Sequence, residues 1–80
     1  MRLDKFLKVS RIIKRRTVAN EACDAGRVTL NGKVAKAGAE VAPGDIIEAR
    51  FGSSLARFKV LSVAETVSKA GAAEMYETIV

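Results

Sequence analysis

The first residues of the chain place apolar side chains at helical spacing. Leu3, Phe6 and Leu7 recur at i, i+3 and i+4, which predicts a short amphipathic helix. Lys5 and Lys8 fall outside this apolar stripe and are expected to point away from it. The chain therefore begins with a helix that has one buried side and one basic side.

A second helix is predicted to begin at Thr17, whose hydroxyl suits the N-cap position, and to run to about Ala25. Gly26 fits the C′ position that ends such a helix, because glycine readily adopts a left-handed backbone conformation. The side of this helix that is expected to be buried is made almost entirely of small residues, which permit close packing against the first helix. These residues are Val18, Ala19, Ala22, Cys23 and Ala25.

After Gly26 the apolar period changes from that of a helix to two, which is typical of strands. Residues 27–30 alternate, and residues 33–35 continue the pattern after a short break. Asn31-Gly32 forms that break and is a strong signal for a two-residue hairpin turn. A strand pair is therefore predicted to follow the two helices.

A second strand pair is predicted in the middle of the chain. Pro43-Gly44 suits the central positions of a type II turn and precedes an expected strand over residues 46–51. A turn at residues 52–54 leads into a further strand over residues 55–63. The side chains of this strand that are expected to share one face are Ala56, Phe58 and Val60.

The last part of the chain has the weakest pattern. Residues 64–71 show no sustained period, whereas four apolar residues beyond them lie at helical spacing and favour a terminal helix over a final strand. These four are Ala72, Met75, Tyr76 and Ile79. The pattern as a whole predicts a single α+β domain over residues 1–80, in which two packed N-terminal helices are followed by a small antiparallel sheet and a short C-terminal segment.

Composition limits the chemistry open to this domain. Eighty residues leave little room for a catalytic cleft, and the chain has no histidine and only one cysteine, Cys23. We therefore expect no disulfide, metal or cofactor, and we interpret Cys23 as a buried structural thiol. Four carboxylates fall in expected turns or solvent-facing positions, which argues against an enzyme. They are Asp24, Glu40, Asp45 and Glu48.

The start of the chain also bears on its location. Charges at positions 2, 4, 5 and 8 interrupt any apolar run that would resemble a signal peptide. No stretch approaches the ~20 apolar residues of a membrane span. We expect a soluble, monomeric protein of a reducing cytoplasm without membrane partners.

The charge is distributed unevenly along the chain. Residues 1–36 contain ten basic and three acidic residues, a net charge of +7, whereas residues 37–80 carry −2. A polyanion would be attracted to the first part and not to the second, which is a typical footprint of nucleic-acid binding. Single charges of this kind are ordinarily just solvated, but a cluster this dense favours a partner that supplies phosphates.

The basic run before the second helix is the most specific part of this cluster. Lys14, Arg15 and Arg16 meet the helix N-terminus, whose free N–H groups and positive dipole end suit a phosphate. Asp4, in the first turn of the first helix, is expected to complement the helix dipole and to hold Arg2 or Lys8 in place. The predicted RNA-binding residues are Arg2, Lys5, Lys8, Arg11, Lys14, Arg15, Arg16 and Thr17, with Arg27, Lys33 and Lys36 as flanking contacts.

Six short motifs in the first two thirds of the chain occur in a known order. They are R-L-D-K-F-L at 2–7, S-R at 10–11, K-R-R-T at 14–17, A-x-x-x-G at 22–26, N-G-K-V at 31–34 and P-G-D-x-I at 43–47. Over about residues 2–52 this combination resembles the S-four (alpha-L) RNA-binding domain. The resemblance implies an S-four-type fold that binds RNA. Arg2, Lys5, Arg16 and Thr17 lie at its matching motif positions, as does Asp4, which is expected to be structural or to orient the site.

Among family members that are little more than the bare domain, the chain is most similar to bacterial ribosome-associated quality-control factors, including an A-x-M-Y-x-x-I ending at 73–79. This resemblance implies binding to a large ribosomal subunit obstructed by peptidyl-tRNA. The protein would contact ribosomal RNA and tRNA there while alanine tails are added to the stalled chain. A companion quality-control factor that recruits alanyl-tRNA is a further partner that the resemblance allows.

Three other interpretations stay open at this stage. The chain also resembles the ribosome-associated heat-shock protein of this family, which implies recycling of obstructed large subunits, although that relative has a Trp at the position of Phe6 and a long basic tail. The second alternative is a protein-interaction adaptor that docks a partner through the acidic sheet region and the C-terminal segment. An architectural DNA binder is the third.

Overall fold

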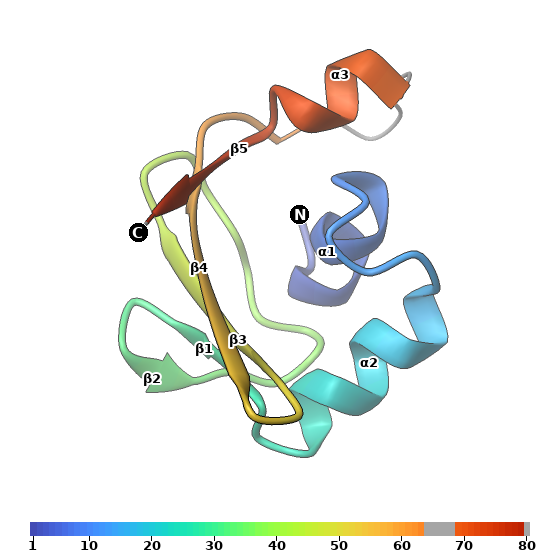
Figure 1. The fold of residues 1–80 in the computed structure, drawn as a ribbon, viewed down its shortest axis with the longest axis vertical. Coiled ribbons are helices and arrows are strands. Elements are labelled where there is room, and N and C mark those ends of the chain that lie inside the picture. The colour runs from blue at the N-terminus through green and yellow to red at the C-terminus, as the bar shows by residue number, and fades with distance from the viewer. Residues whose placement is uncertain (64–68, 80) are drawn as a thin grey trace.

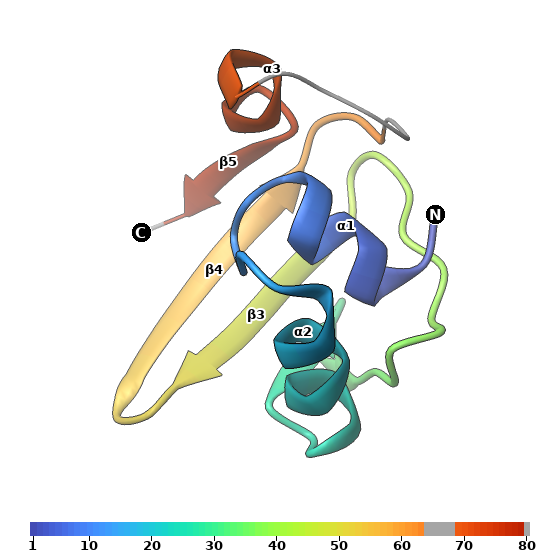
Figure 2. The same cartoon turned by 90° about the vertical axis from the view of Figure 1, so that its right-hand side faces the viewer.

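The computed structural model of the chain describes residues 1–63 and 69–79. Two helices, α1 (Leu3–Val9) and α2 (Arg16–Asp24), form one layer, and it covers one face of a sheet (Figures 1 and 2). A short third helix, α3 (Lys69–Ala73), lies at one end of the molecule, near α1 in both views. The predicted α+β architecture is confirmed.

The sheet has five strands in the order β2-β1-β3-β4-β5, and every neighbouring pair is antiparallel. The strands are β1 (Val28–Leu30), β2 (Lys33–Val34), β3 (Ile46–Phe51), β4 (Ser54–Val60) and β5 (Tyr76–Ile79). The pairing of β3 with β4 extends over six residue pairs and is the longest of the four. These two strands therefore form the centre of the sheet against which the helices pack.

The core is aliphatic and lies between the helix layer and the sheet. Phe6 of α1 is fully buried, and Phe58 of β4 contacts Tyr76 of β5 in an edge-to-face arrangement with ring centroids 5.3 Å apart. The largest fully buried apolar side chains are Phe6, Leu3, Leu7, Ile47, Met75, Val28, Val41 and Val60. As predicted, Cys23 is a buried thiol within this core.

The N-cap of helix α2 lies two residues earlier than the sequence indicates. Arg15 is the N-cap residue, with extended backbone angles and no side-chain cap, so the prediction of Thr17 as N-cap is wrong. Arg16 is held inside the first turn because its side chain, like that of Asn20 one turn later, bonds to Asp4 of α1. A tertiary contact thus overrides the local capping preference of threonine.

The far end of α2 follows the prediction. Gly26 has a φ of +78°, and its N–H donates to the Cys23 carbonyl at 3.0 Å. The N–H of Arg27 donates to the Ala22 carbonyl, also at 3.0 Å. These two bonds are the Schellman arrangement, which satisfies carbonyls that the helix end would leave unpaired.

Both predicted turn signals are confirmed. Asn31 and Gly32 have φ angles of +53° and +86°, as a type I′ turn requires. Gly44 has a φ of +94°, and the N–H of Asp45 donates to the Ala42 carbonyl at 3.1 Å, which closes the predicted type II turn.

The buried side of α2 is narrower than predicted. Ala19 and Cys23 are fully buried against α1, but Val18 is 46% exposed and Ala25 is also exposed. The reason is geometric: α2 packs on α1 and on the sheet through one row of small residues. Val18 and Ala25 lie beside that row and line an open cleft instead.

The end of the chain differs most from its prediction. A helix was expected to extend to Ile79, but α3 ends at Ala73, and Tyr76–Ile79 forms the edge strand β5. Four register pairs with β4, from Arg57↔Ile79 to Val60↔Tyr76, impose the strand. The predicted strand over residues 55–63 ends at Val60, and residues 64–68 of the patternless segment lie outside the described residues.

Candidate nucleic-acid interface

A buried carboxylate joins the two N-terminal helices. Asp4 lies in the first turn of α1, and its side chain is only 3% exposed. Arg2 donates to it through Nε and Nη2, at 3.1 and 3.3 Å, and Arg16 donates through Nε at 3.4 Å. The side-chain amide of Asn20 and the backbone N–H of Lys5 complete the set at 3.3 and 2.8 Å. Asp4 thus organises two arginines from different elements.

Backbone hydrogen bonds fix the position of this carboxylate. The N–H groups of Leu3 and Asp4 donate to the carbonyls of Ala39 and Ala37, at 2.8 and 3.1 Å. The N–H of Val41 donates to the Met1 carbonyl, and the N-terminal ammonium forms an ion pair with Glu40. The first N–H groups of α1 therefore already have acceptors within the protein, so they are not available to bind an anion.

The protonation of Asp4 reflects this environment. Burial alone would raise its pKa, because a charged carboxylate is poorly solvated in the protein interior. The hydrogen bonds from Arg2, Asn20 and Arg16, together with the positive charge of Arg16, outweigh burial and lower the pKa from 3.8 to about 2. Asp4 is therefore ionised at every physiological pH.

Arg2 and Arg16 both donate to Asp4 and remain partly accessible to solvent. The side chains of Arg2 and Arg16 are 52% and 47% exposed, although both donate to the buried carboxylate. Arg16 uses only its Nε toward Asp4, so its terminal nitrogens can still donate to another partner. A hollow of about 380 Å³ adjoins this pair and is lined by Asp4, Arg16, Thr17, Asn20 and Glu21.

The loop between α1 and α2 extends the basic surface. Arg11, Lys14 and Arg15 are all exposed, and Lys8 of α1 is exposed as well. Arg11 has a φ of +64°, which is unusual for a residue with a side chain. The uncapped start of α2 lies at the end of this loop. We give the name basic face to the exposed polar residues between the start of α1 and the first turn of α2, which are Arg2, Lys8, Arg11, Lys14, Arg15, Arg16 and Thr17.

The structure does not bring every predicted contact residue to the basic face. Arg27 follows the C-terminal end of α2, and Lys33 is on β2 in a separate hairpin (Figure 1). Lys36 donates to the Asp24 carbonyl at 3.3 Å, where a cation complements the C-terminal end of the helix dipole. Lys5 is half-buried. RNA contact at any of the predicted positions stays a prediction.

The sequence interpretation missed one member of the Asp4 network. Asn20 lies one helical turn after Arg16, and this i, i+4 spacing puts both side chains on one face of α2. The same spacing could have identified it. Asp4 was expected to hold Arg2 or Lys8; the structure shows Arg2, and in the described part of the chain Asp4 has no bond to Lys8.

Metal-binding clusters and membrane-spanning helices are both absent from the described residues. No group of three or more His, Cys, Asp or Glu side chains there could bind a metal ion. None of the helices in residues 1–63 and 69–79 combines the length and the apolar character that crossing a membrane requires. Burial, together with the charges of Asp4 and Asp24, raises the pKa of the Cys23 thiol to about 11.

The two-helix layer on an antiparallel sheet is the fold of a known family of small domains. The S4 domain model matches residues 1–47 of the chain. Hypothetical protein HP1423, solved in solution, superimposes with a TM-score of 0.85 at 32% identity, over 100% of this chain and 98% of its own. The Vibrio cholerae heat shock protein 15 superimposes with a TM-score of 0.90 at 28% identity, over 99% and 81% of the two chains. The predicted S-four-type fold is confirmed.

More similar relatives narrow the assignment within this class. A protein of Halalkalibacterium halodurans is 57% identical over 96% of this chain and 88% of its own length, and one of Bacillus subtilis is 54% identical over 95% and 88%. Both are named RQC P-site tRNA stabilizing factor. The chain belongs to the S4 domain family and, within it, to the family of the RQC P-site tRNA stabilizing factors (RqcP).

Proposed function

We propose that this protein is a non-catalytic RNA-binding factor of ribosome-associated quality control. It binds ribosomal RNA and tRNA on the large ribosomal subunit. There it stabilises the tRNA in the P site while an alanine tail is added to the stalled nascent chain. The names of its relatives, which specify a P-site tRNA, support this role. The protein is accordingly ribosome-associated in the cytoplasm and acts beside a companion factor that recruits alanyl-tRNA.

The observation that carries this proposal is the arginine pair on Asp4. Guanidinium groups bind phosphate through two parallel N–H donors, and they do so best when their orientation is fixed beforehand. Asp4 fixes Arg2 and Arg16 while each remains about half exposed. Such a pair suits the backbone of a folded RNA, whose phosphates lie at set positions.

Co-sedimentation with purified large subunits that carry peptidyl-tRNA tests this proposal. Replacing both Arg2 and Arg16 with Ala is expected to weaken binding about 10- to 1,000-fold, at ~1.5–3 kcal/mol for each charged hydrogen bond lost and with incomplete additivity. Arg57→Ala is the matched control, because Arg57 is 54% exposed on β4 and pairs with Glu48 away from the basic face.

The salt dependence makes the same test more specific. Each phosphate contact contributes a slope of roughly −0.7 to −0.9 to the plot of log K against log salt. The double variant is expected to flatten the slope by about two contacts, whereas Arg57→Ala leaves it unchanged. Binding that survives in the double variant, or that survives RNA digestion, would contradict the proposal and favour a protein-interaction adaptor. Equal binding of duplex DNA would favour the DNA-binding interpretation.

The role in alanine addition requires a separate experiment. A reconstituted reaction would contain obstructed large subunits, alanyl-tRNA, the companion factor and either this protein or its Arg2/Arg16 double variant. We expect alanine incorporation to depend on the wild-type chain. Incorporation that proceeds equally without the chain would restrict the protein to RNA binding alone.

A second candidate function is the recycling of obstructed subunits, as the resemblance to the heat-shock type implies. The observation that favours it is the close superposition on heat shock protein 15. The two functions predict different end points in the same reaction. Release of peptidyl-tRNA from the subunit without alanine addition would support recycling, whereas retention with alanine addition supports quality control.

A further inference from the structure

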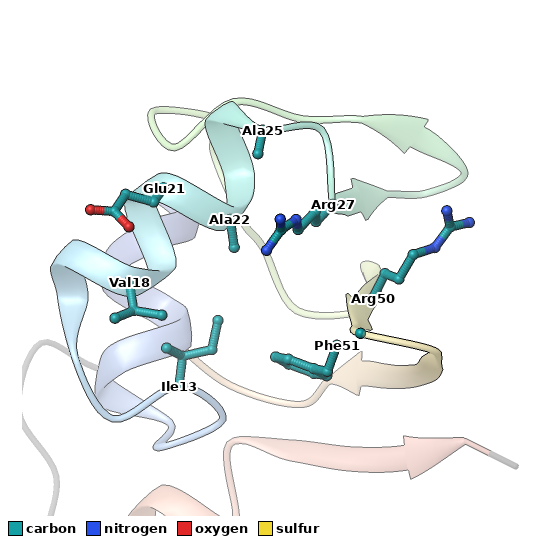
Figure 3. Close-up of a pocket in the computed structure, with 9 residues that line it drawn as sticks. Ile13, Val18, Glu21, Ala22, Ala25, Arg27, Arg50 and Phe51 are labelled. Carbon is teal, nitrogen blue, oxygen red and sulfur yellow. The ribbon is translucent and has the colours of Figure 1, made fainter.

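An open cleft lies beside α2, and its lining shares Glu21 with that of the Asp4 hollow. It has a volume of about 500 Å³ and separates α2 from the tip of the β3–β4 hairpin (Figure 3). Its lining is largely apolar and is supplied by the α1–α2 loop, by α2 and by the end of β3. The apolar lining residues are Ile13, Val18, Ala22, Ala25 and Phe51. A cleft of this size lies within the ~300–1,000 Å³ range of small-ligand sites.

Phe51 supplies an accessible aromatic ring to this cleft. Ile47, Ala49 and Phe51 share the core-facing side of β3, because alternate residues of a strand point to the same face. Ile47 and Ala49 are buried, but Phe51 is 42% exposed. The sheet thus extends past the helix layer at this end, and the ring of Phe51 has one uncovered side. Val18, on the facing helix, is also exposed.

Two arginines add positive charge at the rim. The N–H of Arg50 donates to the Arg27 carbonyl at 2.9 Å, which places both residues at the same edge of the cleft. In Figure 3 the Arg27 guanidinium points toward Ala22 across the cleft, Arg50 extends outward, and the Glu21 carboxylate points away from both arginines. Neither arginine forms an ion pair with another described residue. The Arg27 guanidinium is therefore available to an anion in the cleft, whereas Arg50 adds positive charge outside it.

We propose that this cleft binds one unpaired nucleotide of an RNA, whose base stacks on Phe51 while Arg27 binds an adjacent phosphate. An aromatic face beside arginines is the combination by which proteins hold unstacked bases. The cleft and the Asp4 hollow both border Glu21, so α2 separates two contact sites on one surface. This inference rests on the proposed function, because it requires an RNA partner, but it concerns a different site.

Two oligomers of equal charge separate stacking from electrostatics. We would titrate the full ¹⁵N-labelled chain with hexa-adenylate and with an abasic ribose-phosphate hexamer, and follow the amide signals by NMR. Wild-type protein is expected to bind hexa-adenylate about tenfold more tightly, from the stacking of one base. Shifts at the amides of Ala22, Ala25 and Phe51 would place the base in the cleft.

Three variants identify the ring as the cause. Phe51→Leu keeps an apolar side chain and removes the aromatic face, so it should abolish the difference between the two oligomers. Phe51→Tyr keeps the ring and should preserve the difference. Leu61→Ala is the matched control, since Leu61 is 45% exposed and follows the end of β4 that lies away from the β3–β4 turn. Dispersed amide spectra would show that each variant is folded.

The inference is overturned if Phe51→Leu leaves the difference intact, if it weakens both oligomers equally, or if the wild-type chain binds both alike. Equal binding of the two oligomers by the wild-type chain would instead favour an acidic peptide with an apolar side chain as the ligand of the cleft. The proposed function fails separately, through the Arg2/Arg16 double variant on large subunits. Loss of binding there with no effect at Phe51 would retain RNA binding and reject the nucleotide cleft.

Discussion

Replacing Asp4 with Asn removes the charge that holds the two arginines while it keeps the size of the side chain. The pKa of Asp4 falls from 3.8 to about 2 on folding, and each tenfold change in proton affinity corresponds to ~1.4 kcal/mol. The ionised carboxylate thus stabilises the folded chain by about 2 kcal/mol. Asn also replaces one acceptor oxygen of the carboxylate with an NH2 donor, which cannot bond to the N–H donors of Arg2 and Arg16. We therefore expect the free energy of unfolding to fall by about 2–3 kcal/mol in total.

Urea and thermal unfolding measure this loss. For a domain of this size, about 2–3 kcal/mol corresponds to roughly 8–24 °C in the melting temperature. The sign with pH follows from the depressed pKa: stability from Asp4 is fully present above the unfolded value of 3.8 and is lost as pH falls through about 2. The difference between wild type and Asp4→Asn should therefore be constant from pH 7 to 5 and shrink toward pH 2.

The variant should also weaken RNA binding, because Arg2 and Arg16 lose their fixed orientation. Glu74→Gln removes one exposed carboxylate outside the network and serves as the control for net charge. An Asp4→Asn protein within about 0.5 kcal/mol of wild type at pH 7 would refute the reasoning. So would a difference in stability that persists unchanged at pH 2.

Three further changes test other parts of the structure. Arg11→Gly should raise stability by about 1 kcal/mol in urea unfolding, because glycine fits the φ of +64° without strain, yet it should weaken RNA binding and flatten the salt slope by about one contact. Gly26→Ala should cost about 1 kcal/mol by the same measurement, because its φ is +78° although space for a methyl group is available. Cys23, fully buried and with a pKa raised to about 11, should resist thiol-specific labelling at pH 7.5 in the native chain and react once urea unfolds it. The first argument is contradicted if Arg11→Gly binds RNA more tightly than wild type. The second is contradicted if Gly26→Ala leaves the free energy of unfolding unchanged, and the third if Cys23 is labelled rapidly in the native chain.

The parts of the fold that local chemistry determines were predictable from the sequence. The stripe of Leu3, Phe6 and Leu7 indicated α1, and Asn31-Gly32 indicated the first hairpin, because each signal lies within a few residues of the structure it specifies. The strand at Tyr76–Ile79 was not predictable in this way. Its apolar residues also fit a helix, and only pairing with β4 decides between them.

The candidate site divides along the same line. Charge clustering indicated the basic face, since it needs only composition and order. The start of α2 at Arg16, the place of Asn20 beside Asp4 and the cleft at Phe51 all depend on how helices and hairpin pack. No local pattern encodes the distance between α2 and the β3–β4 turn. The sequence therefore predicts Phe51 only as a strand residue and not as part of a cleft.

The Asp4 network implies that affinity for RNA depends on geometry more than on charge. Arg2, Arg16 and Asp4 together carry a net charge of +1, which is no more than a single solvated arginine would supply. The carboxylate offsets the repulsion between the two guanidiniums and fixes their direction, so a phosphate meets donors that need little further ordering. Removing Asp4 raises the net charge of the face and should still weaken binding. A purely electrostatic interface would respond in the opposite direction.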